Sequence, residues 1–156
     1  RDIEAMCMKL LLQQQPVAKD LRVISSALKM VTDMERIGDN SGDIAEIVTM
    51  ANISAADNTL SIQDMARATI KMVTDSIDAF VKQDVKLATS VIAYDDVVDR
   101  YFDEIKTNLI AKFGDSESDG ETVLDLLMIA KYFERMGDHA AETAKWVLFS
   151  ITGNKE

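Results

Sequence analysis

Cysteine, proline, histidine and tryptophan each occur only once in this chain of 156 residues. The single cysteine, Cys7, cannot form a disulfide within the chain, which is typical of proteins from a reducing compartment. We expect it to act as a small apolar residue on a helix face. The single proline, Pro16, leaves long stretches without the residue that interrupts helices most strongly. With 47% hydrophobic residues, the composition indicates a globular, mainly helical domain.

Basic residues are also scarce, since 17 lysines and arginines face 27 aspartates and glutamates, for a net charge of −10. Such a balance argues against a nucleic-acid surface and favours metal ions or basic partners. No run approaches the roughly 18 apolar residues of a membrane span, so membrane insertion is not expected, and no signal peptide is visible. The sequence begins with Arg1 rather than methionine, and we expect it to be a fragment.

The familiar catalytic signatures are missing too. Ferritin-like di-iron bundles need Glu-x-x-His on two helices, and this spacing does not occur here. There is no Gly-x-Ser-x-Gly, no P-loop, and no histidine near Cys7 in the sequence. His139 points roughly 100° away from Asp138 on a helix. We therefore expect His139 to be exposed or to cap a helix rather than to bind a metal.

What the chain does contain is a repeated motif, Glu-Arg-x-Gly-Asp, at residues 35–39 and again at 134–138, an offset of 134 − 35 = 99. A third acidic residue recurs in register, Asp43 against Glu142. Because positions i, i+4 and i+8 lie on one face of a helix, each copy predicts an acidic stripe. The stripes are Glu35, Asp39 and Asp43, and Glu134, Asp138 and Glu142.

An acidic stripe is usually a solvated helix face, but these two carry costs. Like charges four residues apart destabilise a helix by a few tenths of a kcal/mol. Gly38 and Gly137 each cost roughly 1 kcal/mol relative to alanine in mid-helix. A bound cation would offset the repulsion, and a glycine lets a ligand or another backbone approach closely. Oxygen ligands of this type suit magnesium, manganese or calcium.

Apolar periodicity predicts five helices, with polar loops at 51–59 and 114–120. Ile3, Met6 and Leu10 follow the spacing of a buried stripe on the first of them, and Cys7 is a further candidate for it. Ser61 and Asp84 are expected to cap the third and fourth helices. The expected helices are residues 1–13, 17–50, 61–82, 84–113 and 121–151.

These lengths and short loops predict an antiparallel three-helix bundle for the second half. With the 99-residue offset, the expected fold is all-α, with two repeated antiparallel three-helix bundles. The first repeat, residues 1–52, is incomplete, because Arg1 aligns with Arg100 and the equivalents of earlier positions would lie upstream. The second repeat is residues 53–156. We expect the apolar side chains of the first repeat to lack a covering helix. Either a neighbouring chain supplies that helix, giving a homo-oligomer, or the first half splays away from the second.

A second acidic pair, Asp95 and Asp99, lies on the helix predicted at 84–113. Since neighbouring helices pack about 8–10 Å apart, this pair is expected to face Glu134 and Asp138. Four carboxylates without cations would repel one another, so they would bridge one or more metal ions. The alternative is two separate solvated patches.

Arg36 and Arg135 stand beside the first carboxylate of each motif copy. They either form intrahelical or cross-helix ion pairs, or hold the carboxylates in place around a metal.

At these residues the sequence resembles the PhoU family of phosphate-signalling proteins. The resemblance covers essentially the whole chain and includes both Glu-Arg-x-Gly-Asp copies, Gln15-Pro16 before Asp20-Leu21-Arg22, and residues 95–99. It implies two similar three-helix bundles whose Glu/Asp-x-x-x-Asp motifs bind iron or zinc clusters. Asp43 and Glu142 depart from the amide that we associate with the family at that position. The ligands implied by the resemblance are Glu35, Asp39, Asp95, Asp99, Glu134 and Asp138.

The resemblance also implies a cytoplasmic negative regulator of the phosphate-starvation response. Such proteins work between the ATPase subunit of the phosphate ABC transporter and a membrane sensor histidine kinase. Two alternatives stay open: a metal-dependent hydrolase or oxidase using the same carboxylates, and a purely structural helical adaptor. An enzyme needs an open coordination position and a placed acid or base, and the sequence offers no clear base. We therefore expect a metal-binding regulator that is not an enzyme.

Overall fold

The computed structural model describes residues 1–51, 53, 61–113 and 119–154, and within these residues every regular element is a helix. The predicted loops at 51–59 and 114–120 lie largely outside the described residues. Each observed helix agrees with its prediction to within one residue at either end, so the all-α prediction is confirmed. The helices are α1 (Asp2–Gln14), α2 (Ala18–Met50), α3 (Ile62–Lys82), α4 (Val85–Phe113) and α5 (Gly120–Thr152).

The helix boundaries have identifiable local causes. Pro16 separates α1 from α2, since proline disfavours helix at the residue before it. The predicted cap Asp84 is confirmed, because its Oδ1 accepts a hydrogen bond from the Leu87 amide at 3.0 Å. The side-chain cap predicted at Ser61 is wrong. Ser61 has φ −65° and ψ 27° rather than the extended backbone of most N-caps, and its hydroxyl donates to Glu104 instead.

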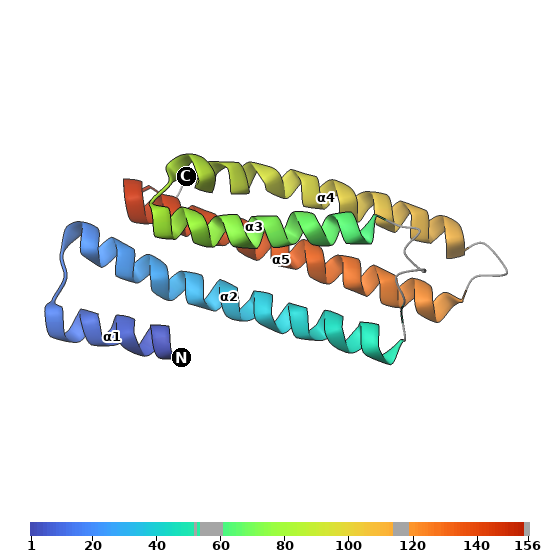
Figure 1. The fold of residues 1–156 in the computed structure, drawn as a ribbon, viewed down its shortest axis with the longest axis horizontal. Helices are drawn as coiled ribbons and strands as arrows, with labels where there is room; N and C mark the ends of the chain where they lie inside the picture. The colour runs from blue at the N-terminus through green and yellow to red at the C-terminus, as the bar shows by residue number, and fades with distance from the viewer. Residues whose placement is uncertain (52, 54–60, 114–118, 155–156) are drawn as a thin grey trace.

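Three helices, α3, α4 and α5, pack against one another, and α4 runs antiparallel to both α3 and α5 (Figure 1). This arrangement is the up-down-up bundle predicted for the second half of the chain. On its other side α5 packs along α2, which runs antiparallel to it, and α1 contacts only α2 among the described helices (Figure 1). The division into domains at residues 52 and 53 stays a prediction. Within the described ranges, no helix combines the length and the apolar character that a membrane crossing needs.

The hydrophobic core lies inside the α3–α4–α5 bundle and is continuous with the face of α5 that meets α2. Small residues make this double contact of α5 possible, since Ala130, Ala140 and Ala144 are fully buried along it. Because α5 packs against α2, α3 and α4, it is the central helix of the described chain. The largest fully buried side chains include Met65, Met72, Val91, Val98, Ile105, Leu109 and Val147.

Helix α1 buries little of its apolar surface. Ile3, Met6 and Leu10 are 57%, 65% and 39% exposed, whereas Cys7 is only 6% exposed. The buried stripe predicted for the first three is therefore wrong, because α2 is the only described helix that packs on α1. The role predicted for Cys7, a small apolar residue on a helix face, agrees with its burial. The exposed strip agrees with the expected lack of a covering helix, while its covering by another chain stays a prediction. The alternative, that the first half splays away from the second, is wrong, because α2 packs along α5.

Candidate metal centre

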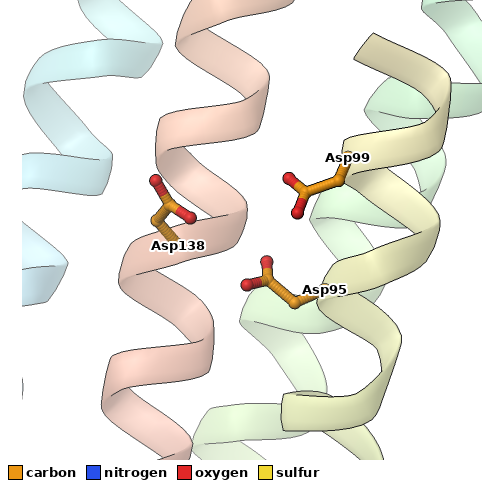
Figure 2. A group of neighbouring side chains, drawn as sticks. All are labelled: Asp95, Asp99 and Asp138. Carbon is orange, nitrogen blue, oxygen red and sulfur yellow. The ribbon is translucent and has the colours of Figure 1, made fainter. Parts of the chain in front are cut away.

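Three carboxylates converge between α4 and α5. Asp95 and Asp99 lie one turn apart on α4 and point toward Asp138 on α5 (Figure 2). One oxygen from each lies within 4.8 Å of the other two. Two oxygens bound to the same cation at about 2.0–2.6 Å can be at most about 4–5 Å apart. The three side chains are therefore close enough to share one ion.

Asp95 is the most strongly perturbed member of this cluster. Burial, followed by the charges of Asp138 and Asp99, raises its pKa from 3.8 to about 6. Its Oδ1 is buried and has no hydrogen-bond partner in the described part of the chain. A buried acceptor without a partner costs about 1–3 kcal/mol. A cation bound between α4 and α5 would satisfy this oxygen, so the site fits a metal ion by its chemistry.

The other two carboxylates are perturbed in the same direction. Partial burial, followed by the charge of Glu134, raises the pKa of both Asp99 and Asp138. Lys131 lowers the pKa of both, and Lys145 that of Asp95, but these opposing effects are smaller. The cluster thus gathers like charges whose repulsion a hard cation would relieve.

Gly137 explains why α4 can come so close to α5 at this point. A Cβ on Gly137 would lie 3.2 Å from Val98 Cγ1 and 3.3 Å from Asp95 Oδ1. The missing side chain therefore leaves the space in which Asp95 sits. A Cβ on Gly38 would meet nothing within 4 Å. At Gly137 the groups that approach closely are side chains rather than the expected ligand or backbone, and at Gly38 no described backbone comes close, so approach of a ligand there stays a prediction.

Glu134, the fourth predicted member, lies at the edge of the cluster. Its Oε2 accepts a hydrogen bond from Lys131 Nζ at 2.6 Å, and Lys131 also lies over the ring of Phe102. Glu134 is not among the three carboxylates that come within 4.8 Å of one another. Lys131 is not part of the predicted site, although its three-residue spacing from Glu134 is a signal for such a pair.

The first motif copy forms no comparable cluster. Glu35 and Asp39 are exposed on α2, and within the described ranges only the cluster at 95, 99 and 138 gathers three potential ligands. By the 99-residue offset, Arg1 matches Arg100, the position just after Asp99, and α1 begins one residue later at Asp2. No described residue therefore occupies the positions equivalent to Asp95 and Asp99.

The two motif arginines and His139 differ from their predictions. Neither Arg36 nor Arg135 forms an ion pair in the described part of the chain, so the interpretation as intrahelical or cross-helix ion pairs is wrong there. Arg135 instead lies over the ring of Tyr132.

His139 is neither exposed nor a cap. Its Nδ1 lies 3.1 Å from Oδ1 of the buried Asp33, and this contact links α5 to α2. Nothing in the motif pattern signalled Asp33, which lies outside both copies.

The raised pKa values of Asp95, Asp99 and Asp138 predict how the stability of the metal-free chain depends on pH. A carboxyl group with a higher pKa in the folded state binds more protons there than in the unfolded state. Stability therefore falls as the pH rises from about 4 to about 6 and stays lower above that. After allowance for solvent screening of the half-exposed Asp95, we expect a loss of about 1–2 kcal/mol, or roughly 2–8 °C in melting temperature.

Thermal melts of the chelator-treated and dialysed protein between pH 4 and 7.5 measure this effect. Asp95→Asn should flatten the profile, because the amide has no proton to lose. An equally steep fall in Asp95→Asn would show that other groups cause the pH dependence.

Comparison with known proteins gives concordant results. The family model described as the PhoU domain matches residues 1–48 and 62–147. The phosphate-specific transport system accessory protein PhoU homolog of Clostridium acetobutylicum is 33% identical over 157 residues, which is 99% of this chain and 72% of that protein. The crystal structure of PhoU from Pseudomonas aeruginosa superposes with a TM-score of 0.84 at 32% identity, covering 99% of this chain and 75% of that one. The phosphate transport system regulatory protein PhoU from Streptococcus pneumoniae gives 0.85 at 26% identity, covering 98% and 72%.

Proposed function

The chain belongs to the PhoU family, and from this premise we propose that it is a metal-binding regulator of phosphate uptake. The observation that carries the proposal is the family match over both repeats. The names of its relatives describe phosphate transport accessory and regulatory proteins. We propose the sense of the regulation as negative, so that the chain restrains the phosphate-starvation response when phosphate is plentiful.

The metal part of the proposal rests on the carboxylate cluster. We propose Asp95, Asp99 and Asp138 as the ligands of a divalent or trivalent ion, with Glu134 beside them. Support comes from the unpartnered Asp95 Oδ1 and from the raised pKa of all three carboxyl groups. The oxygen donors favour hard ions such as magnesium or manganese, and the family resemblance adds iron and zinc. A bound ion would neutralise the cluster and fix α4 against α5.

We propose that the first copy, Glu35 and Asp39, binds metal only where further carboxylates are brought opposite it. In the described chain both side chains are exposed on α2 without such partners. Metal binding by the 156-residue chain is therefore assigned to the second copy alone.

The proposed partners are the ATPase subunit of the phosphate ABC transporter and a sensor histidine kinase, both engaged from the cytoplasm. The exposed apolar residues of α1 are available for contact with a further chain, which supports a homo-oligomer. We propose no catalytic activity. Near the carboxylates, Glu134 is bonded to Lys131 and His139 is held by Asp33 toward α2, so neither is placed as a free acid or base for a hydrolase or oxidase.

The test uses the full chain in a bacterium whose own PhoU-type gene has been deleted. At high phosphate, expression of the chain should reduce a phosphate-starvation reporter several-fold. Asp95→Asn/Asp138→Asn should lose most of this reduction, because two proposed ligands are gone. The matched control Asp64→Asn/Asp103→Asn removes the same number of charges from exposed residues that pair with Arg67 and Lys106, and it should behave as the unsubstituted chain. A reporter that stays high although the chain accumulates normally would contradict the proposal.

A further inference from the structure

A second candidate site lies on the other side of α5, where that helix meets α2. An open depression of about 310 Å³ is lined by Arg36, Asp39, Asn40, Arg135 and His139. The carboxylate cluster contributes no side chain to this lining. The two sites are therefore separate, with Asp138 directed toward α4 (Figure 2) and His139 toward α2.

The lining is built from equivalent positions of the two repeats. Arg135 matches Arg36, since 135 − 36 = 99, and His139 matches Asn40, since 139 − 40 = 99. Because α2 and α5 pack side by side in opposite directions (Figure 1), the middle of one helix faces the middle of the other. Each repeat thus brings one arginine and one polar residue to the same hollow.

The two guanidinium groups gather positive charge in a strongly acidic protein. Neither arginine has an ion pair with a carboxylate among the described residues, and Arg135 lies 6.0 Å from the Tyr132 ring. The side chain of Asn40 is buried. His139 is oriented by its contact with Asp33. Asp39 is the one acidic residue among the five described lining residues. Two guanidinium groups against one carboxylate give the lining a net positive charge, before any charge on His139 is counted.

We propose that this depression binds a phosphate oxyanion, either free or as the phosphoryl group of a small nucleotide. A guanidinium presents its donors as a planar fork that matches the oxygens of a phosphate group, and charge-assisted hydrogen bonds of this kind are the stronger ones. Two forks from opposite helices satisfy a tetrahedral dianion better than one. The side-chain amide of Asn40 adds a neutral donor. This inference rests on the arginines and does not depend on a role in phosphate uptake.

Calorimetric titration of the metal-free chain at an ionic strength of about 0.1 M, where charges more than about 10 Å apart are screened, tests the proposal. Chelator is removed by dialysis beforehand, so that neither a bound metal nor the chelator competes for the anion. Inorganic phosphate and ADP are titrated separately, with adenosine as the uncharged comparison. Binding of phosphate identifies a free-anion site, and binding of ADP without phosphate or adenosine identifies a phosphoryl site. Absence of binding by both phosphate and ADP overturns the proposal.

Substitutions then locate the binding. Arg36→Gln/Arg135→Gln should weaken it at least about tenfold, since each arginine supplies a charge-assisted contact. The control Lys19→Gln/Arg67→Gln removes two positive charges outside the lining and should leave the affinity within about twofold, because exposed distant charges are largely screened. Asp39→Asn should tighten binding, since it removes the one like charge. Equal weakening in the arginine variant and its control would overturn the site. The five substituted side chains are exposed, so their replacement should not disturb the fold. Unchanged melting curves would confirm that the variants fold.

Discussion

A divalent ion added at about 1,000 times its Kd should raise the melting temperature of the metal-free chain by about 8–16 °C. A ligand that binds only the folded state stabilises it by mass action, here by about 4 kcal/mol. In this molecule the ion would remove repulsion among Asp95, Asp99 and Asp138 and would supply a partner for the buried Asp95 Oδ1. The measurement is a melting curve with and without metal, repeated after chelation.

Asp95→Asn/Asp138→Asn separates metal binding from repulsion. Without metal this variant should melt above the unsubstituted chain, because two of the three mutually repelling charges are gone. With metal it should gain little, so the two curves should lie within about 2 °C of each other. Asp64→Asn/Asp103→Asn should keep the full response to metal. An unsubstituted chain that neither retains metal on purification nor responds to added metal would mean that the acidic cluster is a solvated helix face.

A leucine at Gly137 should destabilise the protein by about 1–3 kcal/mol, whereas a leucine at Gly38 should stabilise it by several tenths of a kcal/mol. The Cβ at Gly137 already comes within 3.3 Å of Val98 and Asp95, and a longer side chain must push α4 away. The Cβ at Gly38 meets nothing within 4 Å, so the gain in helix propensity is not opposed. The two substitutions are matched, since they change the same residue in the two copies of one motif.

Urea unfolding at equal protein concentration gives both free energies of unfolding. The Gly137→Leu variant should also lose affinity for metal, since the displaced helix carries Asp95 and Asp99 with it. Two similar changes in stability would show that the close approach at Gly137 is unimportant. A destabilised Gly137→Leu variant with unchanged metal affinity would show that the glycine serves packing alone.

The helices and their order could be predicted because local rules decided them. Apolar periodicity set the extent of each helix, and the carboxylate of Asp84 had a free amide to accept from at the start of α4. The cluster at Asp95, Asp99 and Asp138 was predictable for a related reason. Four-residue spacing fixed the face on each helix, and the predicted three-helix bundle indicated which helices would meet.

Contacts that depend on the relative rotation of packed helices could not be predicted. The pair of Asp33 and His139 joins residues 106 positions apart, and no periodic pattern on α2 or α5 marks it. Ser61 has the composition of a cap, yet its backbone angle and the nearby Glu104 decide where its hydroxyl points. On α1, the spacing of Ile3, Met6 and Leu10 gave an apolar face correctly, but spacing alone does not tell whether another helix covers that face.

The serial packing of α1 on α2 and of α2 on α5 implies an order in which the molecule opens. α1 can detach by giving up its contacts with α2 alone, whereas α5 cannot leave without disrupting α2, α3 and α4. Proteins open in cooperative units whose free energies rise with the amount of buried contact. The N-terminal helix α1 is therefore the unit of lowest local stability. Helix α2, which packs on both α1 and α5, is the next unit to open. Events that displace α1 leave the cluster between α4 and α5 intact, so the outer helix can exchange contacts while the carboxylates hold their geometry.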